Sequence, residues 1–311
     1  MIDVSIIIVT WNSREDLERC LPSLAGGVRK HTSEVILVDN ASVDESIPFV
    51  RSILPAARII QNDVNAGFAA ANNQALLSAA GRFVCLLNPD TIVYEDGLDA
   101  LVDFMDANPR AWASGPAMYN GDGTAQRTGV RFPSLWNLTV ETLFLDRLFA
   151  STRLFGAHRE LFRSSTTSRP VDYVQGACLM VRREAVENVG GLDERFFMYF
   201  EETDWCFRFK QAGGEVWLVP SAGVIHFGGG STGHFDEQRL VYYFESLLRF
   251  YDKHHGAIGR AAVRILVFLR SASRIPIWIL TGVVRPRLRA AARSSCRGYA
   301  RVIRSLLSAG S

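Results

Sequence analysis

The sequence lacks the paired cysteines of a disulfide framework or a zinc-binding module. Its five cysteines are odd in number, and none is followed by a second at the CxxC spacing. Small secreted scaffolds and zinc sites depend on such pairs at short, regular intervals. No basic segment with a cleavable apolar run precedes the first strand-like sequence, so we expect no signal peptide. A reducing cytoplasm is the expected compartment.

The usual nucleotide-binding signatures are missing as well. Residues 228–233 (GGGSTG) have no lysine in the P-loop position, and their GxGxxG spacing does not follow the first predicted strand, where the dinucleotide-binding motif belongs. P-loop kinase and dinucleotide-binding folds are therefore not expected. The glycine run is either a plain linker or a loop that closes over a bound diphosphate.

Acidic residues are missing from the end of the chain. The net charge is only +2, but residues 256–311 hold 11 arginines and no acid, which leaves 23 basic and 32 acidic residues in 1–255. Such a segment attracts an anionic partner, either a membrane surface or a nucleic acid. We therefore predict one domain over residues 1–255 and a separate basic tail over 256–311.

The tail also lacks an uninterrupted apolar run. Within residues 263–284 the interruptions are Arg264, Arg270, Arg274 and Pro276. They disfavour a helix that spans a bilayer. A basic amphipathic helix on the cytoplasmic face of the anionic inner membrane fits better. The apolar cluster at 275–280 (IPIWIL) favours this lipid partner over nucleic acid.

Short apolar runs alternate with helical patterns at the start of the chain, whose composition, 48% hydrophobic and 21% charged, is that of a globular protein. The patterns predict strands at 4–9, 34–38, 58–61 and 83–87, and helices at 15–24, 44–54 and 66–80. This alternation is typical of an α/β fold with a mostly parallel sheet flanked by helices. A strand at 216–219 and a helix at 237–251 are predicted beyond a looser region at 110–169.

Polar side chains follow each of these four strands. The clusters are Thr10-Trp11-Asn12, Asp39-Asn40-Ala41-Ser42, Asn62–Asn65 and Asn88-Pro89-Asp90. Open parallel sheets bind ligands at the carboxyl ends of their strands, so this edge is the predicted site. Asp39 could accept a hydrogen bond from a ribose or a base, whereas Asn40 and Ser42 could equally be helix caps.

The segment after the third strand also carries unusual residues. Gly67 permits a close backbone approach to a ligand. Asn72 and Asn73 lie in an alanine-rich helix, where they face either a polar ligand or solvent. Asp90 could hold a hard divalent cation, Mg²⁺ or Mn²⁺, against a diphosphate, although Asn-Pro-Asp is also a good turn. His226 is either a further metal ligand or a core residue.

Three acidic residues, Glu201, Glu202 and Asp204, lie among bulky apolar residues at 197–206. Carboxylates are rarely buried unless they are paired, bind metal or move protons. Burial raises the pKa of a carboxyl group, as a general base near neutral pH requires. The alternative is a helix start whose acids face solvent.

Together these motifs resemble the family 2 glycosyltransferases of the GT-A fold, in particular the rhamnosyltransferase-like members of bacterial polysaccharide assembly. The resemblance covers about residues 3–250 and is carried by 4–12 (VSIIIVTWN), 38–42 (VDNAS), 65–73 (NAGFAAANN), 86–90 (LLNPD), 176–180 (GACLM) and 190–194 (GGLDE). It implies an inverting transfer of a sugar from a nucleotide diphosphate to a glycan or lipid-linked glycan acceptor.

The resemblance also implies roles for individual residues. Donor binding is expected at Thr10, Trp11, Asn12, Asp39, Asn65, Gly67, Asn72 and Asn88. Asp90, in place of the family's Asp-x-Asp, and His226 would bind the metal. We expect Glu202 to be the general base, with Asp204 as the second candidate and Glu201 orienting it. dTDP-L-rhamnose is a candidate donor.

Within the predicted domain, residues 1–109 would bind the nucleotide sugar, and residues 110–255 would carry the acceptor and catalytic half. Two other functions compete. A sugar-phosphate nucleotidyltransferase shares such a sheet, but no glycine-rich basic signature follows the first strand here. A non-catalytic membrane-associated scaffold would not require Glu202, Asp204, Asp90 and His226 together.

Overall fold

The computed structural model describes residues 1–126, 128–149, 152, 166–228 and 237–308. They fall into two compact units. The first takes its described residues from Met1–Phe132, Leu161–Phe197 and Glu201–Gly228, and the second from Pro133–Glu160, Met198–Phe200 and Gly229–Ser311.

A nine-stranded sheet forms the centre of the first unit, in the order β3-β2-β1-β4-β10-β6-β11-β5, with β8 paired to β11. The strands are β1 (Val4–Thr10), β2 (Ser33–Asp39), β3 (Arg58–Gln61), β4 (Phe83–Leu87), β5 (Thr91–Val93), β6 (Ala111–Tyr119), β8 (Arg169–Val171), β10 (Cys178–Arg182) and β11 (Glu215–His226). Strands β10, β5 and β8 run against the others. The predicted mostly parallel sheet is therefore confirmed. A small separate sheet pairs β7 (Gly129–Val130) with β9 (Tyr173–Val174).

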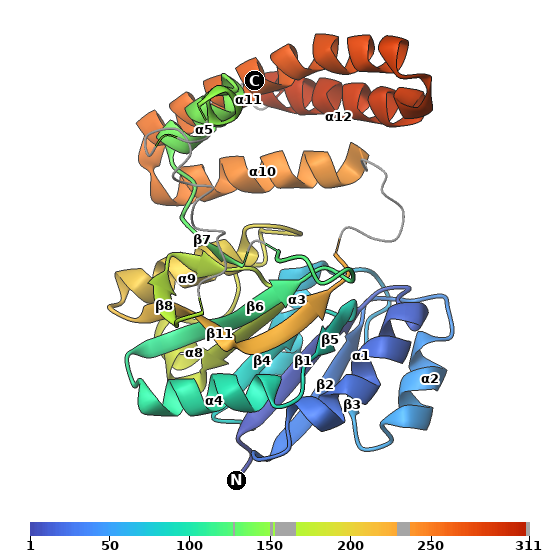
Figure 1. The fold of residues 1–311 in the computed structure, drawn as a ribbon, viewed down its shortest axis with the longest axis vertical. Helices are drawn as coiled ribbons and strands as arrows, with labels where there is room; N and C mark the ends of the chain where they lie inside the picture. Colours follow the sequence, from blue (N-terminus) through green and yellow to red (C-terminus); the bar gives the residue numbers. More distant parts are fainter. Residues whose placement is uncertain (127, 150–151, 153–165, 229–236, 309–311) are drawn as a thin grey trace. The chain divides into compact units, whose positions relative to one another are not determined.

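Helices cover both faces of the large sheet (Figure 1). They are α1 (Arg14–Gly27), α2 (Ser46–Ile53), α3 (Phe68–Leu76), α4 (Gly97–Ala107), α8 (Arg183–Val189) and α9 (Glu201–Gln211). One core lies under α1, α2 and α4, and the other lies under α3, α8 and α9. In β1, Ile6 and Ile8 enter the first core and Ile7 enters the second. Burial on both faces explains why this strand is a continuous apolar run.

The predicted elements of the first half are present, and the bounds of β3 and β4 match those predicted. The strand predicted at 216–219 is longer, because β11 continues to His226 after a register shift between Val219 and Gly223. Pro220 lies in this interruption and has no N–H for the ladder. The extension carries His226 to the sheet edge beside Asp90.

The second unit is helical, and the predicted helical tail is confirmed. It contains α5 (Leu135–Thr142), α6 (Leu145–Leu148), α10 (Glu237–His254), α11 (Gly256–Val284), the 3₁₀ turn η1 (Pro286–Leu288) and α12 (Arg289–Ser308). Helices α11 and α12 lie side by side as a hairpin (Figure 1). Among the described helices, none has an apolar stretch long enough to cross a membrane.

Candidate active site

The carboxyl ends of the first parallel strands bring the predicted donor-binding residues to one edge. Thr10 lies opposite Asp39, and Asp39 lies opposite Gln61. Strand β4 ends at Leu87 beside Ile8, so the 88–90 segment begins at the same edge. Four clusters separated in sequence are thus adjacent in space, as predicted.

Asn12 and Asp39 hold the loop that follows β2. Asn12 adopts a left-handed backbone conformation (φ 51°). Its Oδ1 accepts a hydrogen bond from Val43 N–H (2.8 Å), and its own N–H donates to Ser42 Oγ (2.9 Å). Asp39 Oδ1 accepts from Ser42 N–H (3.2 Å). Trp11 between these elements is exposed, so its ring is available for a flat partner such as a base.

The amide side chains of α3 are buried or engaged, which removes the solvent-facing alternative. Asn72 is only 1% exposed and donates through Nδ2 to Phe68 O (2.8 Å). Asn72 Oδ1 and Thr10 Oγ1 accept no hydrogen bond from the described residues. Asn73 instead holds the 190–194 turn, because it pairs with both backbone groups of Leu192 (2.9 Å each).

Gly67 makes a close approach that only glycine allows. It has φ 85°, and a Cβ here would lie 2.7 Å from the Phe197 ring. Its N–H donates to Asn65 Oδ1 (3.0 Å), and the next N–H, of Phe68, donates to Phe197 O (3.1 Å). Phe197 is therefore the close neighbour of Gly67. The contact joins the loop at 65–67 to the segment before α9.

Asp90 and His226, which the sequence predicts as metal ligands, lie side by side. His226 lies opposite Thr91 in the pairing of β11 with β5. Its Nε2 is 3.4 Å from Asp90 Oδ1. This buried carboxylate oxygen accepts no hydrogen bond from the described residues. Phe227 N–H donates to Asp90 O (2.9 Å) and holds the two segments together.

Gln126, which the sequence did not reveal, orients His226. Its Nε2 donates to His226 O (2.5 Å) and to Asn120 Oδ1 (2.7 Å), so its Oε1 is the acceptor. That oxygen lies 3.0 Å from His226 Nδ1. The proton of the neutral ring therefore sits on Nδ1. His226 Nε2 is left with a lone pair that faces Asp90 Oδ1.

Two acceptor atoms facing each other fit a cation between them. A carboxylate and a neutral imidazole are suitable ligands. At metal sites the ring nitrogen that does not bind the metal usually donates a hydrogen bond, as Nδ1 does here. Among the described residues, no group of three or more His, Cys, Asp and Glu is placed to hold a metal. A cation here would complete its coordination with ligand phosphate oxygens and water, as Mg²⁺ commonly does.

The acidic block opens α9. Glu201 is buried and Glu202 is half-buried. Each has one buried carboxylate oxygen, Oε2, without a hydrogen-bond partner among the described residues. Burial raises the pKa of Glu202, while N–H groups at the helix start and at Gly176 oppose the shift. Burial, aided by the charge of Glu202, raises the pKa of Glu201 well above its ordinary value. Glu202 is the less buried of the two and faces these N–H groups, so it is the better candidate for the carboxylate that carries the charge.

Asp204 has a different environment. Its side chain is fully buried and accepts from Arg208 Nε at 2.8 Å. Arg208 also donates to Val189 O (2.8 Å) and Gly191 O (2.7 Å). The pair thus joins α9 to the turn after α8. This engagement favours Glu202 over Asp204 as the group available to an acceptor.

The segment before β10 connects the acidic block with the strand edge. Asn88 N–H donates to Ala177 O (2.9 Å). The preceding residue, Gly176, lies against Glu202, since a Cβ there would be 3.5 to 3.8 Å from the glutamate side chain. Residues 176–177 therefore contact both the end of β4 and the start of α9.

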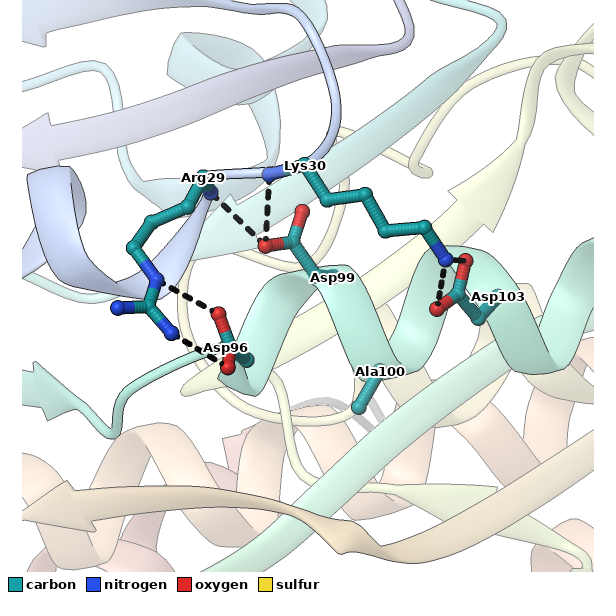
Figure 2. Close-up of a pocket in the computed structure, with 6 residues that line it drawn as sticks. All are labelled: Arg29, Lys30, Asp96, Asp99, Ala100 and Asp103. Carbon is teal, nitrogen blue, oxygen red and sulfur yellow. Dashed lines mark hydrogen bonds and ion pairs between the residues drawn. The ribbon is translucent and has the colours of Figure 1, made fainter.

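A pocket of about 440 Å³ lies elsewhere, between the residues that precede β2 and the first turns of α4 (Figure 2). Its charges are already paired. Arg29 binds Asp96 (2.7 Å), Lys30 binds Asp103 (2.7 Å), and Asp99 accepts the N–H groups of Arg29 and Lys30. These bonds make it a structural ion-pair cluster. The role predicted for the glycine run at 228–233 is not tested, because 229–233 lie outside the described residues.

The chain is similar in sequence to known proteins. The family model described as glycosyl transferase family 2 matches residues 5–190. An N-acetylglucosaminyl-diphospho-decaprenol L-rhamnosyltransferase of Mycobacterium tuberculosis is 31% identical over 94% of each chain. The rhamnosyltransferase WbbL of Escherichia coli is 25% identical over 54% of this chain and 61% of its own.

The fold also matches a solved structure of GalNAc-T7 with UDP, GalNAc and Mn²⁺. The TM-score is 0.58 at 15% sequence identity. The match covers 81% of this chain and 48% of that one. At this identity the likeness concerns the fold alone.

Proposed function

The chain belongs to glycosyl transferase family 2 and is a glycosyltransferase, and we propose that it transfers L-rhamnose, with inversion, from dTDP-L-rhamnose to a lipid-linked glycan. The rhamnosyltransferases of M. tuberculosis and E. coli support the sugar. The alignment with the M. tuberculosis enzyme covers 94% of both chains. Its name supports an acceptor that carries N-acetylglucosamine on a polyprenyl diphosphate.

The observation that carries the proposal is the convergence of two different groups. The Asp90–His226 pair lies at the strand edge, and the half-buried Glu202 contacts the segment that holds Asn88. A group that stabilises a departing diphosphate and a group that accepts a proton are what an inverting transfer requires.

The chemical step follows from these roles. Glu202 takes the proton from the acceptor hydroxyl, whose oxygen attacks the anomeric carbon. The bond from that carbon to the phosphate oxygen breaks on the opposite face, and the nucleoside diphosphate leaves. Glu201 remains protonated beside Glu202, because its burial and the neighbouring negative charge both disfavour its ionised form.

Asp90 and His226 would hold a divalent cation, Mg²⁺ or Mn²⁺. Such an ion neutralises the charge that develops on a departing diphosphate. On the donor side, we assign Thr10, Trp11, Asn12, Asp39, Asn65, Gly67, Asn72 and Asn88 to the nucleotide-sugar site. Asn12, Asn65 and Gly67 would act by shaping the loops, given their hydrogen bonds.

We also assign the second unit to the cytoplasmic face of the inner membrane. Several of its exposed apolar side chains lie at the end of α11 and in η1: Ile277, Ile279, Leu280, Val283, Val284 and Leu288. The arginines of η1 and α12 follow directly. Apolar and cationic side chains together are the composition of interfacial helices.

The test is transfer by the purified full chain. dTDP-L-rhamnose, a polyprenyl-diphosphate N-acetylglucosamine and Mn²⁺ or Mg²⁺ are supplied, and the product is analysed by NMR for its anomeric configuration. An α-configured donor giving a β-linked product, or the reverse, is expected. Retention would reject the single-displacement mechanism. Formation of dTTP from added diphosphate and the donor would instead identify a nucleotidyltransferase. If no nucleotide sugar is turned over, the non-catalytic scaffold is the remaining function.

A further inference from the structure

A cavity of about 610 Å³ lies between the end of α11 and the first half of α12. It belongs entirely to the second unit and shares no residue with the candidate active site. Its lining is Ile279, Gly282 and Val283 from α11, and Arg289, Ala292, Arg293, Cys296 and Arg297 from α12.

One side of the cavity is apolar and open to the surroundings. Gly282 allows the two helices to meet closely, because a Cβ there would lie 3.0 Å from the Ala292 Cβ. Beside this contact, Ile279 and Val283 remain 56% and 66% exposed. An apolar surface of this kind is costly in water and marks a place for an apolar partner.

The other side carries positive charge. Arg289, Arg293 and Arg297 are spaced four residues apart and therefore share one face of α12. Arg297 is bound to Glu237 (3.2 Å), and Arg289 Nε donates to Gly282 O (3.3 Å). Within the described part of the chain, no carboxylate pairs with Arg289 or Arg293. Two guanidinium groups are thus left for an external anion.

We propose that this cavity binds one phosphate-bearing lipid of an anionic bilayer, with the headgroup phosphate at Arg289 and Arg293 and the chain along Ile279 and Val283. Guanidinium groups match phosphate in charge and in hydrogen-bond geometry. A free phosphate would satisfy the arginines but not the apolar wall, so the two sides together select a lipid. The inference rests on the proposed membrane association and adds a defined site to it.

Cys296 offers a probe of the site in the native chain. It lines the cavity, whereas the other four cysteines are buried. We would measure the rate of its alkylation by iodoacetamide, by mass spectrometry, with vesicles of phosphatidylcholine alone or mixed with phosphatidylglycerol, and with inorganic phosphate alone. When the accessible lipid is present at about ten times its Kd for the cavity, the bound lipid should slow the alkylation of Cys296 about tenfold.

The matched variants are Arg293→Glu and Arg304→Glu. Both residues are exposed on α12 and each change alters the net charge equally, but Arg304 does not line the cavity. At vesicle concentrations that sediment all of the protein, Arg293→Glu should lose the protection of Cys296 and Arg304→Glu should keep it.

The outcomes separate the site from membrane association. If the unmodified chain does not sediment with anionic vesicles, the proposed association fails. If it sediments but Cys296 is not protected, or if both variants retain protection, the cavity is not the lipid site. Equal protection by inorganic phosphate alone would overturn the assignment to a lipid.

Discussion

His226 Nε2 and Asp90 Oδ1 lie 3.4 Å apart, and Gln126 Oε1 lies 3.0 Å from the other nitrogen of the same ring. The glutamine keeps the imidazole proton on the side away from the carboxylate. The pair is thereby left as two electron-pair donors directed at one point. Gln126, which is 100 residues from His226, would thus position that ring for the proposed metal.

Gln126→Leu should weaken Mn²⁺ binding about 10- to 100-fold, the usual effect of losing the outer partner of a metal-binding histidine. Isothermal titration with Mn²⁺ in the presence of nucleoside diphosphate measures it directly. Gln211→Leu, at an exposed position at the end of α9, is the control. Unchanged Mn²⁺ affinity in Gln126→Leu would show that the tautomer is set by something else.

Glu202→Gln should lower turnover by at least about 100-fold, because a positioned base contributes about 10²- to 10⁴-fold. The amide keeps the shape of the side chain but cannot accept the proton. Donor binding, followed by titration with the nucleotide sugar, should survive. Glu187→Gln, on the exposed side of α8, should turn over normally. Near-normal turnover in Glu202→Gln would reject this residue as the base.

Asp204→Asn should act on folding rather than on chemistry. It leaves the largely buried guanidinium of Arg208 without its carboxylate, and breaking one side of a buried ion pair costs about 3 to 5 kcal/mol. Denaturant unfolding should show that loss, while the fraction that remains folded turns over at the normal rate. A stable Asp204→Asn protein without activity would instead favour Asp204 as the base.

Glu201→Gln should remove a pH-dependent destabilisation. The raised pKa of buried Glu201 means that the native chain keeps this proton over a pH range in which the unfolded chain releases it. Stability therefore falls as the pH rises from the ordinary glutamate pKa to the raised pKa, by about 1.4 kcal/mol for each pH unit between these two values.

The Tm of each variant and of the unmodified chain is measured at several pH values between 5 and 8. The advantage of Glu201→Gln over the unmodified chain should grow as the pH rises, whereas Glu187→Gln should show no such trend. A constant difference across this range would mean that Glu201 titrates normally.

Gly67→Ala and Gly26→Ala form a matched pair. A Cβ at Gly67 meets the Phe197 ring at 2.7 Å on a backbone with φ 85°, whereas a Cβ at Gly26 meets nothing within 4 Å. Alanine at position 67 should destabilise the fold by about 1 to 3 kcal/mol. At position 26, in α1, it should be neutral or stabilise by up to about 1 kcal/mol. Equal midpoints in a denaturant titration would contradict the close approach at Gly67.

Local patterns in the sequence were sufficient for the strands and helices over residues 4–87. The bounds of β3 and β4 and the clusters after each strand follow from apolar runs and turn residues, which act over a few neighbouring positions. The Asp204–Arg208 pair also carried a local signal, because residues four apart face each other on a helix. The interpretation of Asp204 as a possible base overlooked that signal.

Other features depended on contacts between distant residues. Gln126 meets His226 only because β11 passes its register shift and runs on to the sheet edge, and no pattern near residue 126 encodes that meeting. The pKa difference between Glu201 and Glu202 likewise depends on Gly176 and on burial.

The sequence by itself therefore determined which residue types stand at the strand ends and at the start of α9. Tertiary structure alone decided which of them are buried, paired or left with an open lone pair. The physical reason is that backbone preference is set by near neighbours, whereas desolvation and hydrogen bonding are set by whatever the folded chain brings alongside.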